Sequence, residues 1–188
     1  NAPTGNKALL VTAERILFAL GAGGNPRKVQ WCDQEDNTVW TPLATNQAGD
    51  FELATVGTLI AGKRVKGVNL LFTDVDVHTA QYIGAPFVYG FEKAASGCGL
   101  ISAQAVAAID TAAIWMSKSG FWIYDGYAKP LPCDVSDFVF NNNNTHIRLR
   151  TTISSNTMNA ISVTNFSYSN ENLSDDQSLS NMRDSYVV

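Results

Sequence analysis

Short runs of β-branched and aromatic residues recur along the first 140 residues, and turns rich in Gly, Asp or Ser separate them. Two such runs on either side of a short turn form an antiparallel hairpin. Three hairpins are expected, at 15–20 with 28–31, at 68–73 with 77–82, and at 112–116 with 121–124. This succession of strands and turns predicts an all-β fold.

The hairpins recur at a nearly constant interval. Counted from turns at Asp33, Asp74 and Ser117, the spacings are 41 and 43 residues. A period of roughly 40 to 50 residues, made of about four short strands, is typical of a β-propeller blade. Three periods are fewer than the roughly four to eight blades of a closed ring. The sequence therefore predicts a partial or fragmentary β-propeller built from blade-like hairpin repeats.

The Ala-rich stretch 102–113 is open to two interpretations. Its composition favours a helix, whereas its place in the repeat favours two strands around Asp110 and Thr111. Tertiary context commonly overrides intrinsic propensity. We therefore expect strands at 106–109 and 113–116.

The composition changes near residue 140. Gly, Pro, Cys and Trp are all absent from 141–188, which is rich in Asn and Ser and opens with four Asn residues. We expect blades in 1–140 and a polar β or extended appendage of unassigned role in 141–188. The chain also begins with Asn1 rather than Met, in loop-like sequence, which indicates a fragment or a processed piece.

Charge and cysteine content narrow the possible functions. The formal net charge is −4, and no run of Lys or Arg is long enough to grip a phosphate backbone, which disfavours nucleic-acid binding by charge. The three cysteines form no C-x-x-C pair, so neither a disulfide framework nor a Cys-rich zinc site is expected. Because the apolar runs are short and no basic region precedes an apolar core near residue 1, we expect neither a transmembrane span nor a signal peptide.

Three segments, taken together, resemble a known family. They are 31–42 (WCDQEDNTVWTP), 71–91 (LFTDVDVHTAQYIGAPFVYGF), and 98–101 (CGLI) continuing into 115–126 (WMSKSGFWIYDG). Their order and spacing resemble the propeller region of tail hub or nozzle proteins of short-tailed bacteriophages, the packaged-DNA stabilisation type. The similarity covers residues 10–140, and the segment 145–163 does not follow the family pattern.

The resemblance implies a structural protein of the virion tail, folded in the host bacterial cytoplasm. It implies a ring, with six-fold symmetry, that contacts portal, adaptor and other tail proteins and encloses a channel for double-stranded DNA. DNA would pass through this channel without specific binding. The resemblance implies no catalytic residue, cofactor or membrane. A mildly acidic wall would let DNA slide, and we expect the turn carboxylates to face solvent, the lumen or neighbouring subunits: Asp33, Glu35, Asp36, Asp74 and Asp76.

The strongest chemical candidate is Asp74, Asp76 and His78, which alternate in sequence. In an extended strand they would share one face and offer oxygen and nitrogen ligands to a divalent metal. The alternative is a blade turn in which the Asp side chains bond nearby backbone N–H groups and His78 begins the next strand. We favour the turn and expect no metal.

Two alternatives to a structural role remain open, a glycosidase and a carbohydrate-binding module. A glycosidase needs two positioned carboxylates, and the turn carboxylates together with Glu92 supply candidates in number only, so we expect no enzymatic activity. A glycan platform would need exposed rings, whereas strand aromatics pack more often in the core. The rings concerned are Trp31, Trp40, Trp115, Trp122, Phe72, Phe121 and Tyr124.

Two further motifs have ordinary structural explanations. The loop 21–24 lacks the Gly-Lys-Ser/Thr of a P-loop, and Pro26 prevents the helix that a dinucleotide site requires. Cys98 has no His nearby in sequence, so we expect a small buried side chain rather than a reactive thiol.

Overall fold

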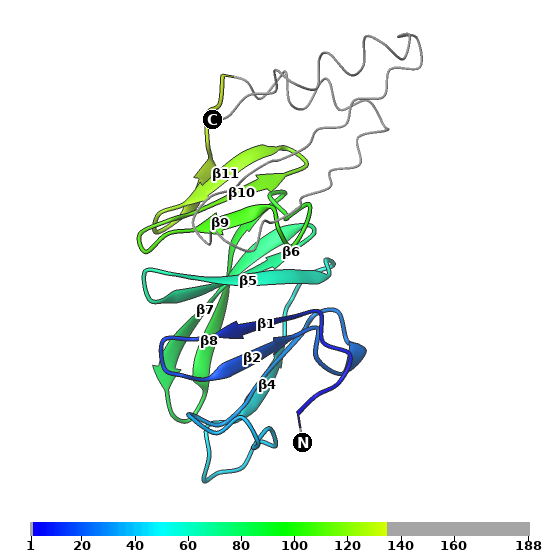
Figure 1. Ribbon diagram of the computed structural model, residues 1–188, viewed down its shortest axis with the longest axis vertical. Helices are drawn as coiled ribbons and strands as arrows, with labels where there is room; N and C mark the ends of the chain where they lie inside the picture. Colours follow the sequence, from blue (N-terminus) through cyan, green and yellow to red (C-terminus); the bar gives the residue numbers. More distant parts are fainter. Residues whose placement is uncertain (1, 135–188) are drawn as a thin grey trace, which may run out of the picture. The chain divides into compact units, whose positions relative to one another are not determined.

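The computed structural model describes residues 2–134 and shows an all-β architecture. The chain divides into two units, Asn1–Cys133 and Asp134–Val188. The first unit consists of three four-stranded antiparallel sheets that follow one another along the chain (Figure 1). The appendage expected at 141–188 lies outside the described residues.

The first sheet has the strand order β1-β2-β3-β4, so every strand pairs with its neighbour in sequence. Alternation along β3 shows why these residues form a strand, since Val29 and Trp31 are buried while Lys28 and Gln30 are partly exposed. A short 3₁₀ turn, η1 (Ala22–Gly24), follows Gly21, whose φ of 70° favours glycine. The strands are β1 (Ala8–Val11), β2 (Leu17–Leu20), β3 (Lys28–Trp31) and β4 (Gly49–Glu52).

The middle sheet has the order β5-β6-β7-β8. Its second strand contains the run Leu70, Leu71 and Phe72, whose side chains are all fully buried. Because successive side chains of a strand point to opposite faces, both faces of this sheet must be covered. The strands are β5 (Leu59–Val65), β6 (Val68–Thr73), β7 (Asp76–Gly84) and β8 (Val88–Ser96).

The third sheet has the order β9-β10-β11-β12. Strand β9 pairs with β10 in antiparallel register, with Ala108 opposite Ala113 and Val106 opposite Trp115. The prediction of two strands rather than a helix around Asp110 is therefore confirmed. The strands are β9 (Val106–Ala108), β10 (Ala113–Ser117), β11 (Gly120–Tyr124) and β12 (Ala128–Pro130).

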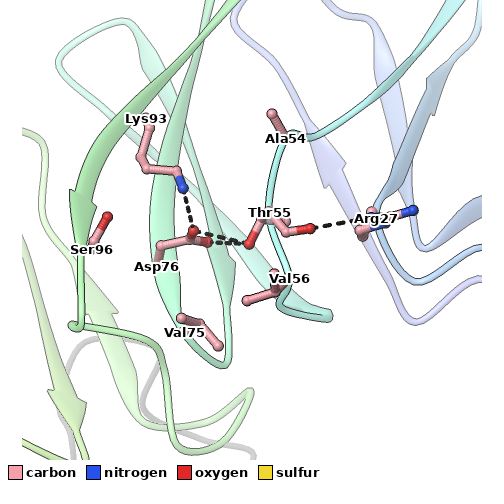
Figure 2. Close-up of a pocket in the computed structure, with 8 residues that line it drawn as sticks. All are labelled: Arg27, Ala54, Thr55, Val56, Val75, Asp76, Lys93 and Ser96. Carbon is pink, nitrogen blue, oxygen red and sulfur yellow. Dashed lines mark hydrogen bonds and ion pairs between the residues drawn. The ribbon is translucent and has the colours of Figure 1, made fainter.

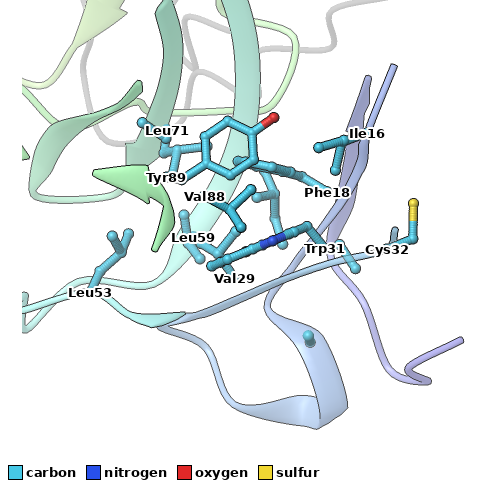
Figure 3. Packing of buried hydrophobic residues seen from close by; sticks show 14 of the residues in the cluster. Ile16, Phe18, Val29, Trp31, Cys32, Leu53, Leu59, Leu71, Val88 and Tyr89 are labelled. Carbon is cyan, nitrogen blue, oxygen red and sulfur yellow. The ribbon is translucent and has the colours of Figure 1, made fainter. Parts of the chain in front are cut away.

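Two hydrophobic clusters hold the sheets together, one on each face of the middle sheet. In the first, Phe18 and Trp31 of the first sheet pack with Leu71 and Tyr89 of the middle sheet (Figure 3). The rings of Phe18 and Tyr89 meet edge to face, with centroids 4.7 Å apart. Large aromatic side chains dominate such cores because each buries a large apolar area.

In the second cluster, Leu70 and Phe72 of the middle sheet pack with Trp115 of the third. The Phe72 and Trp115 rings lie 5.3 Å apart. The indole N–H of Trp115 donates a hydrogen bond to the Cys98 carbonyl at 2.7 Å, which satisfies the polar edge of a fully buried ring. The middle sheet is thus enclosed by its two neighbours in sequence.

All three expected hairpins are confirmed, since β2 pairs with β3, β6 with β7 and β10 with β11. The prediction is wrong about which turn of the first sheet corresponds to the turns at Asp74 and Ser117. Asp74 and Ser117 mark the turn between the second and third strands of their sheets, but Asp33 follows the third strand of the first sheet. The equivalent turn in the first sheet is the loop 21–27. This loop is longer than the other two turns, so the repeats cannot be aligned correctly from turn spacing alone.

The described part of the chain consists of strands, turns and one short 3₁₀ turn. No helix there is long and apolar enough to cross a membrane.

Candidate functional site

A buried carboxylate, that of Asp76, forms the polar centre of the first unit. Asp76 is the first residue of β7 and is 2% exposed. The Thr73 hydroxyl, at the end of β6, contacts Asp76 Oδ1 at 2.6 Å. The Thr55 hydroxyl, from the linker between the first two sheets, lies 2.9 Å from both carboxylate oxygens. Asp76 therefore ties a linker to a strand turn.

Two basic side chains complete this cluster. Lys93, on the neighbouring strand β8, places its Nζ 2.9 Å from Asp76 Oδ2. His78, two residues along β7, places its Nε2 3.1 Å from Asp76 Oδ1 and is 3% exposed. A buried carboxylate is stable only with such hydrogen bonds and counter-charge.

The surroundings lower the pKa values of both Asp76 and His78. Burial alone would raise the pKa of Asp76, but hydrogen bonds from Thr73, Lys93 and Thr55 outweigh burial and lower it. Burial lowers the pKa of His78, and the adjacent Asp76 only partly opposes that change. At neutral pH the cluster therefore holds an ionised Asp76 beside a neutral His78.

An open hollow of about 430 Å³ lies beside this cluster (Figure 2). Its walls combine two cations, small polar groups and exposed apolar side chains, and Asp76 is the single carboxylate among the residues that line it. Both cations are already paired, since Arg27 binds Glu52 and Lys93 binds Asp76. The lining residues are Arg27, Ala54, Thr55, Val56, Val75, Asp76, Lys93 and Ser96.

The turn between β6 and β7 is clamped by the linkers on either side of the middle sheet. Asp74 Oδ1 accepts a hydrogen bond from the Thr58 N–H at 2.6 Å. On the other side, the Gly99 N–H donates to the Val75 carbonyl at 3.1 Å. A Cβ at Gly99 would lie 2.1 Å from the Asp74 carbonyl carbon, so only glycine fits this approach.

The structure separates the three proposed metal ligands. Asp76 and His78 are in contact, but Asp74 is exposed and caps the Thr58 N–H as a turn residue. Across residues 2–134, no group of three or more His, Cys, Asp or Glu side chains is arranged to hold a metal ion. The alternation of Asp74, Asp76 and His78 does not place them on one face, because Asp74 precedes the strand that begins at Asp76.

The prediction that all five turn carboxylates are exposed is wrong for Asp76, which is buried. Glu35, Asp36 and Asp74 are exposed and Asp33 is partly so. Asp33 Oδ1 accepts hydrogen bonds from the N–H groups of Gln34 and Gln47. Asp76 is buried because its partners come from the linker before β5 and from β8, segments that the turn pattern does not connect to it.

Most of the proposed aromatic platform is core. Trp31, Trp40 and Trp115 are each less than 5% exposed. Trp122 is partly buried and its ring stacks near Trp115, at a centroid distance of 6.3 Å. Cys98 is fully buried as expected, and burial raises the pKa of its thiol to about 11.

Sequence reasoning missed Thr55, Thr73 and Lys93, which determine the state of Asp76. Thr73 had a local signal, because a Thr hydroxyl can hydrogen-bond the backbone of the turn that follows it, as Thr73 does with the N–H groups of Val75 and Asp76. Thr55 and Lys93 had none, since they lie 21 residues before and 17 residues after Asp76 in sequence.

The fold and this cluster define an all-β module. In it, a buried carboxylate with several hydrogen-bond partners connects the middle sheet to the linker from the first sheet, next to an open hollow. Comparison with known proteins adds no relative, because the sequence matches no protein-family model and no curated protein.

Proposed function

We propose that this chain forms β-propeller blades in a tail hub or nozzle protein of a short-tailed bacteriophage. In this role it is a structural component of the virion that assembles as a ring below the portal. The ring forms part of the channel that retains and later ejects double-stranded DNA. The sequence resemblance over residues 10–140 is the source of this specific role.

One observation supports the blade architecture above all. The middle sheet is covered on one face by the first sheet and on the other by the third, through two separate hydrophobic clusters. The first strands of successive sheets also contact each other, β1 with β5 and β5 with β9. Four-stranded antiparallel sheets stacked in sequence order, with their first strands adjacent, are the arrangement of propeller blades around an axis.

The charge arrangement favours a surface that does not hold DNA. Among residues 2–134, five of the ten Lys and Arg side chains are paired with carboxylates of the same chain, which reduces the attraction of these five for phosphate. These ion pairs are Arg15 with Glu35, Arg27 with Glu52, Lys28 with Asp50, Lys93 with Asp76, and Lys129 with Asp125. A wall of this kind lets DNA slide.

The test is the oligomeric mass of the protein, measured by native mass spectrometry or particle imaging with and without phage portal and adaptor proteins. A closed ring, formed alone or on the portal, is the expected result. A protein that stays monomeric under both conditions contradicts a hub role.

One specific contact supports a second candidate, a carbohydrate-binding module. Phe51 of β4 is 42% exposed and stacks on Phe91 of β8, with centroids 4.4 Å apart and planes at 2°. The outer side of such a pair offers an aromatic surface on which a sugar ring can stack. A glycan that binds the native protein but not Phe51→Ala would favour this role over the hub.

A further inference from the structure

The open hollow beside Asp76 differs in charge from the chain as a whole. Two cations, Arg27 and Lys93, and one carboxylate, Asp76, are among the residues that line it (Figure 2). The lining therefore carries a formal charge of +1, whereas the whole chain carries −4. A positively charged hollow on an acidic protein favours an anionic ligand.

Both cations keep hydrogen-bond donors for such a ligand. Among the described residues, Lys93 Nζ contacts one acceptor, Asp76 Oδ2, and an ammonium group has three N–H donors. The Arg27 guanidinium has five donors and contacts the Thr55 carbonyl and Glu52. The side chains of Arg27 and Glu52 are 45% and 48% exposed, so their ion pair is a weak surface pair. A ligand carboxylate can bind Arg27 beside Glu52 or in its place.

The hollow suits a small polar ligand. Its volume of about 430 Å³ lies within the roughly 300–1,000 Å³ of small-molecule sites. Because it is open, a charged ligand keeps part of its hydration and does not cover the ion pairs with apolar groups. Ser96 is exposed and supplies a hydroxyl group, and Val56, 92% exposed, supplies an apolar surface. These groups match a ligand that has an anionic group, hydroxyl groups and C–H faces.

An aromatic pair adjoins the two cations. Phe91 precedes Lys93 by two residues on β8, so their side chains point to the same face, roughly 7 Å apart. Phe51 of β4 stacks on Phe91 and is next in sequence to Glu52, the partner of Arg27. The exposed side of Phe51 offers a surface on which a sugar ring can stack. A ring-stacking surface and a cationic hollow therefore lie next to each other.

We propose that the hollow binds the carboxylate of an acidic saccharide, a chain of two or more sugars that includes a uronic acid. Arg27 holds the carboxylate through paired N–H donors and Lys93 through its charge. The Phe51–Phe91 pair holds the adjacent sugar ring. This inference rests on the carbohydrate-binding candidate, whose ligand class it names, and it is independent of the hub role.

The experiment compares two ligands that differ in charge. Tetragalacturonic acid and its full methyl ester have the same sugar rings, but only the acid carries carboxylates. Isothermal titration calorimetry measures the binding of each to the full chain. We expect the acid to bind at least about tenfold more tightly than the ester, because hydrogen bonds to a charged group are lost in the ester. Added salt should weaken binding of the acid only, since it screens exposed charges.

Charge changes at Val56 test the place of binding. This side chain lines the hollow and is 92% exposed, so replacing it leaves the core intact. Val56→Asp should weaken binding of the acid about threefold and Val56→Lys should strengthen it about threefold, the effect of a unit charge about 7 Å away in water. The ester should bind both variants as it binds the native chain. Ile109→Asp and Ile109→Lys are the matched controls, since Ile109 is 62% exposed and does not line the hollow.

The possible outcomes separate this inference from the carbohydrate candidate. Equal binding of acid and ester, or the same change in the Val56 and Ile109 variants, would overturn the assignment of the carboxylate to the hollow. Inorganic phosphate that binds as tightly as the acid would make the hollow a general anion site and overturn the saccharide assignment. The carbohydrate candidate is judged separately, by glycan binding that Phe51→Ala abolishes, and the hub role by the oligomeric mass.

Discussion

The Thr55 hydroxyl lies 2.9 Å from both oxygens of the Asp76 carboxylate, although the two residues are 21 positions apart. Thr55 belongs to the linker that leaves the first sheet, and Asp76 begins the third strand of the middle sheet. Their contact fixes where the chain passes from one sheet to the next. Both residues also line the open hollow beside this contact.

The first prediction concerns the charge at this contact. Asp76→Asn keeps the size of the side chain but removes the charge that Lys93 and two hydroxyl groups stabilise. We expect a loss of about 1–3 kcal/mol in the free energy of unfolding, as for other hydrogen bonds to buried charged groups. Urea denaturation measures the loss. Asp74→Asn is the matched control, because its amide oxygen still accepts from the Thr58 N–H; equal losses in both variants would contradict the assignment.

Acid should weaken the fold in two separate ranges of pH. Burial lowers the pKa of His78 in the folded state below its ordinary value of 6.5. As the pH falls through about 6.5, the unfolded chain therefore binds more protons than the folded chain, and the free energy of unfolding decreases. His78→Gln should reduce the loss between about pH 6.5 and 5. The chain has two histidines, so an unchanged pH profile in this variant would assign the loss to other groups.

The second range belongs to Asp76. Its pKa is lowered in the folded state, so its contribution to stability is present above its ordinary value of 3.8 and disappears as the pH falls through the lower folded value. Asp76→Asn should therefore flatten the stability profile below about pH 4 and leave the His78 range in place. Chemical denaturation at a series of pH values measures both effects. A variant with the native slope below this pH would contradict the assignment.

Glycine at position 99 should be required by space rather than by backbone angle. A Cβ there meets the backbone of the β6–β7 turn at 2.1 Å, and backbone cannot move aside as a flexible side chain can. We expect Gly99→Ala to cost about 1–3 kcal/mol or more by overpacking. Gly90→Ala is the control, because its nearest neighbour would be an Ile83 methyl group at 3.5 Å. Similar melting temperatures for the two variants would contradict the tight packing of Gly99 against the β6–β7 turn.

The cysteines should differ in reactivity. Cys32 and Cys98 are buried, and burial raises the pKa of both thiols, that of Cys98 to about 11. Cys133 is partly exposed. A thiol reagent at pH 8 should therefore modify Cys133 in the native protein and the other two only after unfolding. Rapid native modification of Cys98 would show that the interface between the middle and third sheets opens readily.

The hairpins could be predicted from the sequence because their pairing is local. Runs such as 68–73 and 77–82 are separated by two or three turn residues, so their register follows from the turn itself. The Ala-rich segment was also assigned correctly, since its place between turns outweighed its helix propensity. The loop at 21–27 was the exception, because its length concealed which strands of the first sheet correspond to those of the others.

The candidate site could not be predicted from the sequence, because its residues are far apart in the chain and meet only in the folded structure. Thr55 and Lys93 reach Asp76 only after a linker crosses the turn and two strands pair, and Tyr89 meets Thr12 across 77 positions. Turn chemistry placed Asp74 and Asp76 in one exposed group, whereas the partners that bury Asp76 come from other segments.

The sequence by itself determined the strands, the three local hairpins and a core of aromatic side chains, because alternation and turn residues act over a few positions. Only the tertiary structure decided which faces meet, which carboxylate is buried and charged, and which side chains line the open hollow. Those properties depend on burial and on pairing between distant segments, which local sequence patterns do not specify.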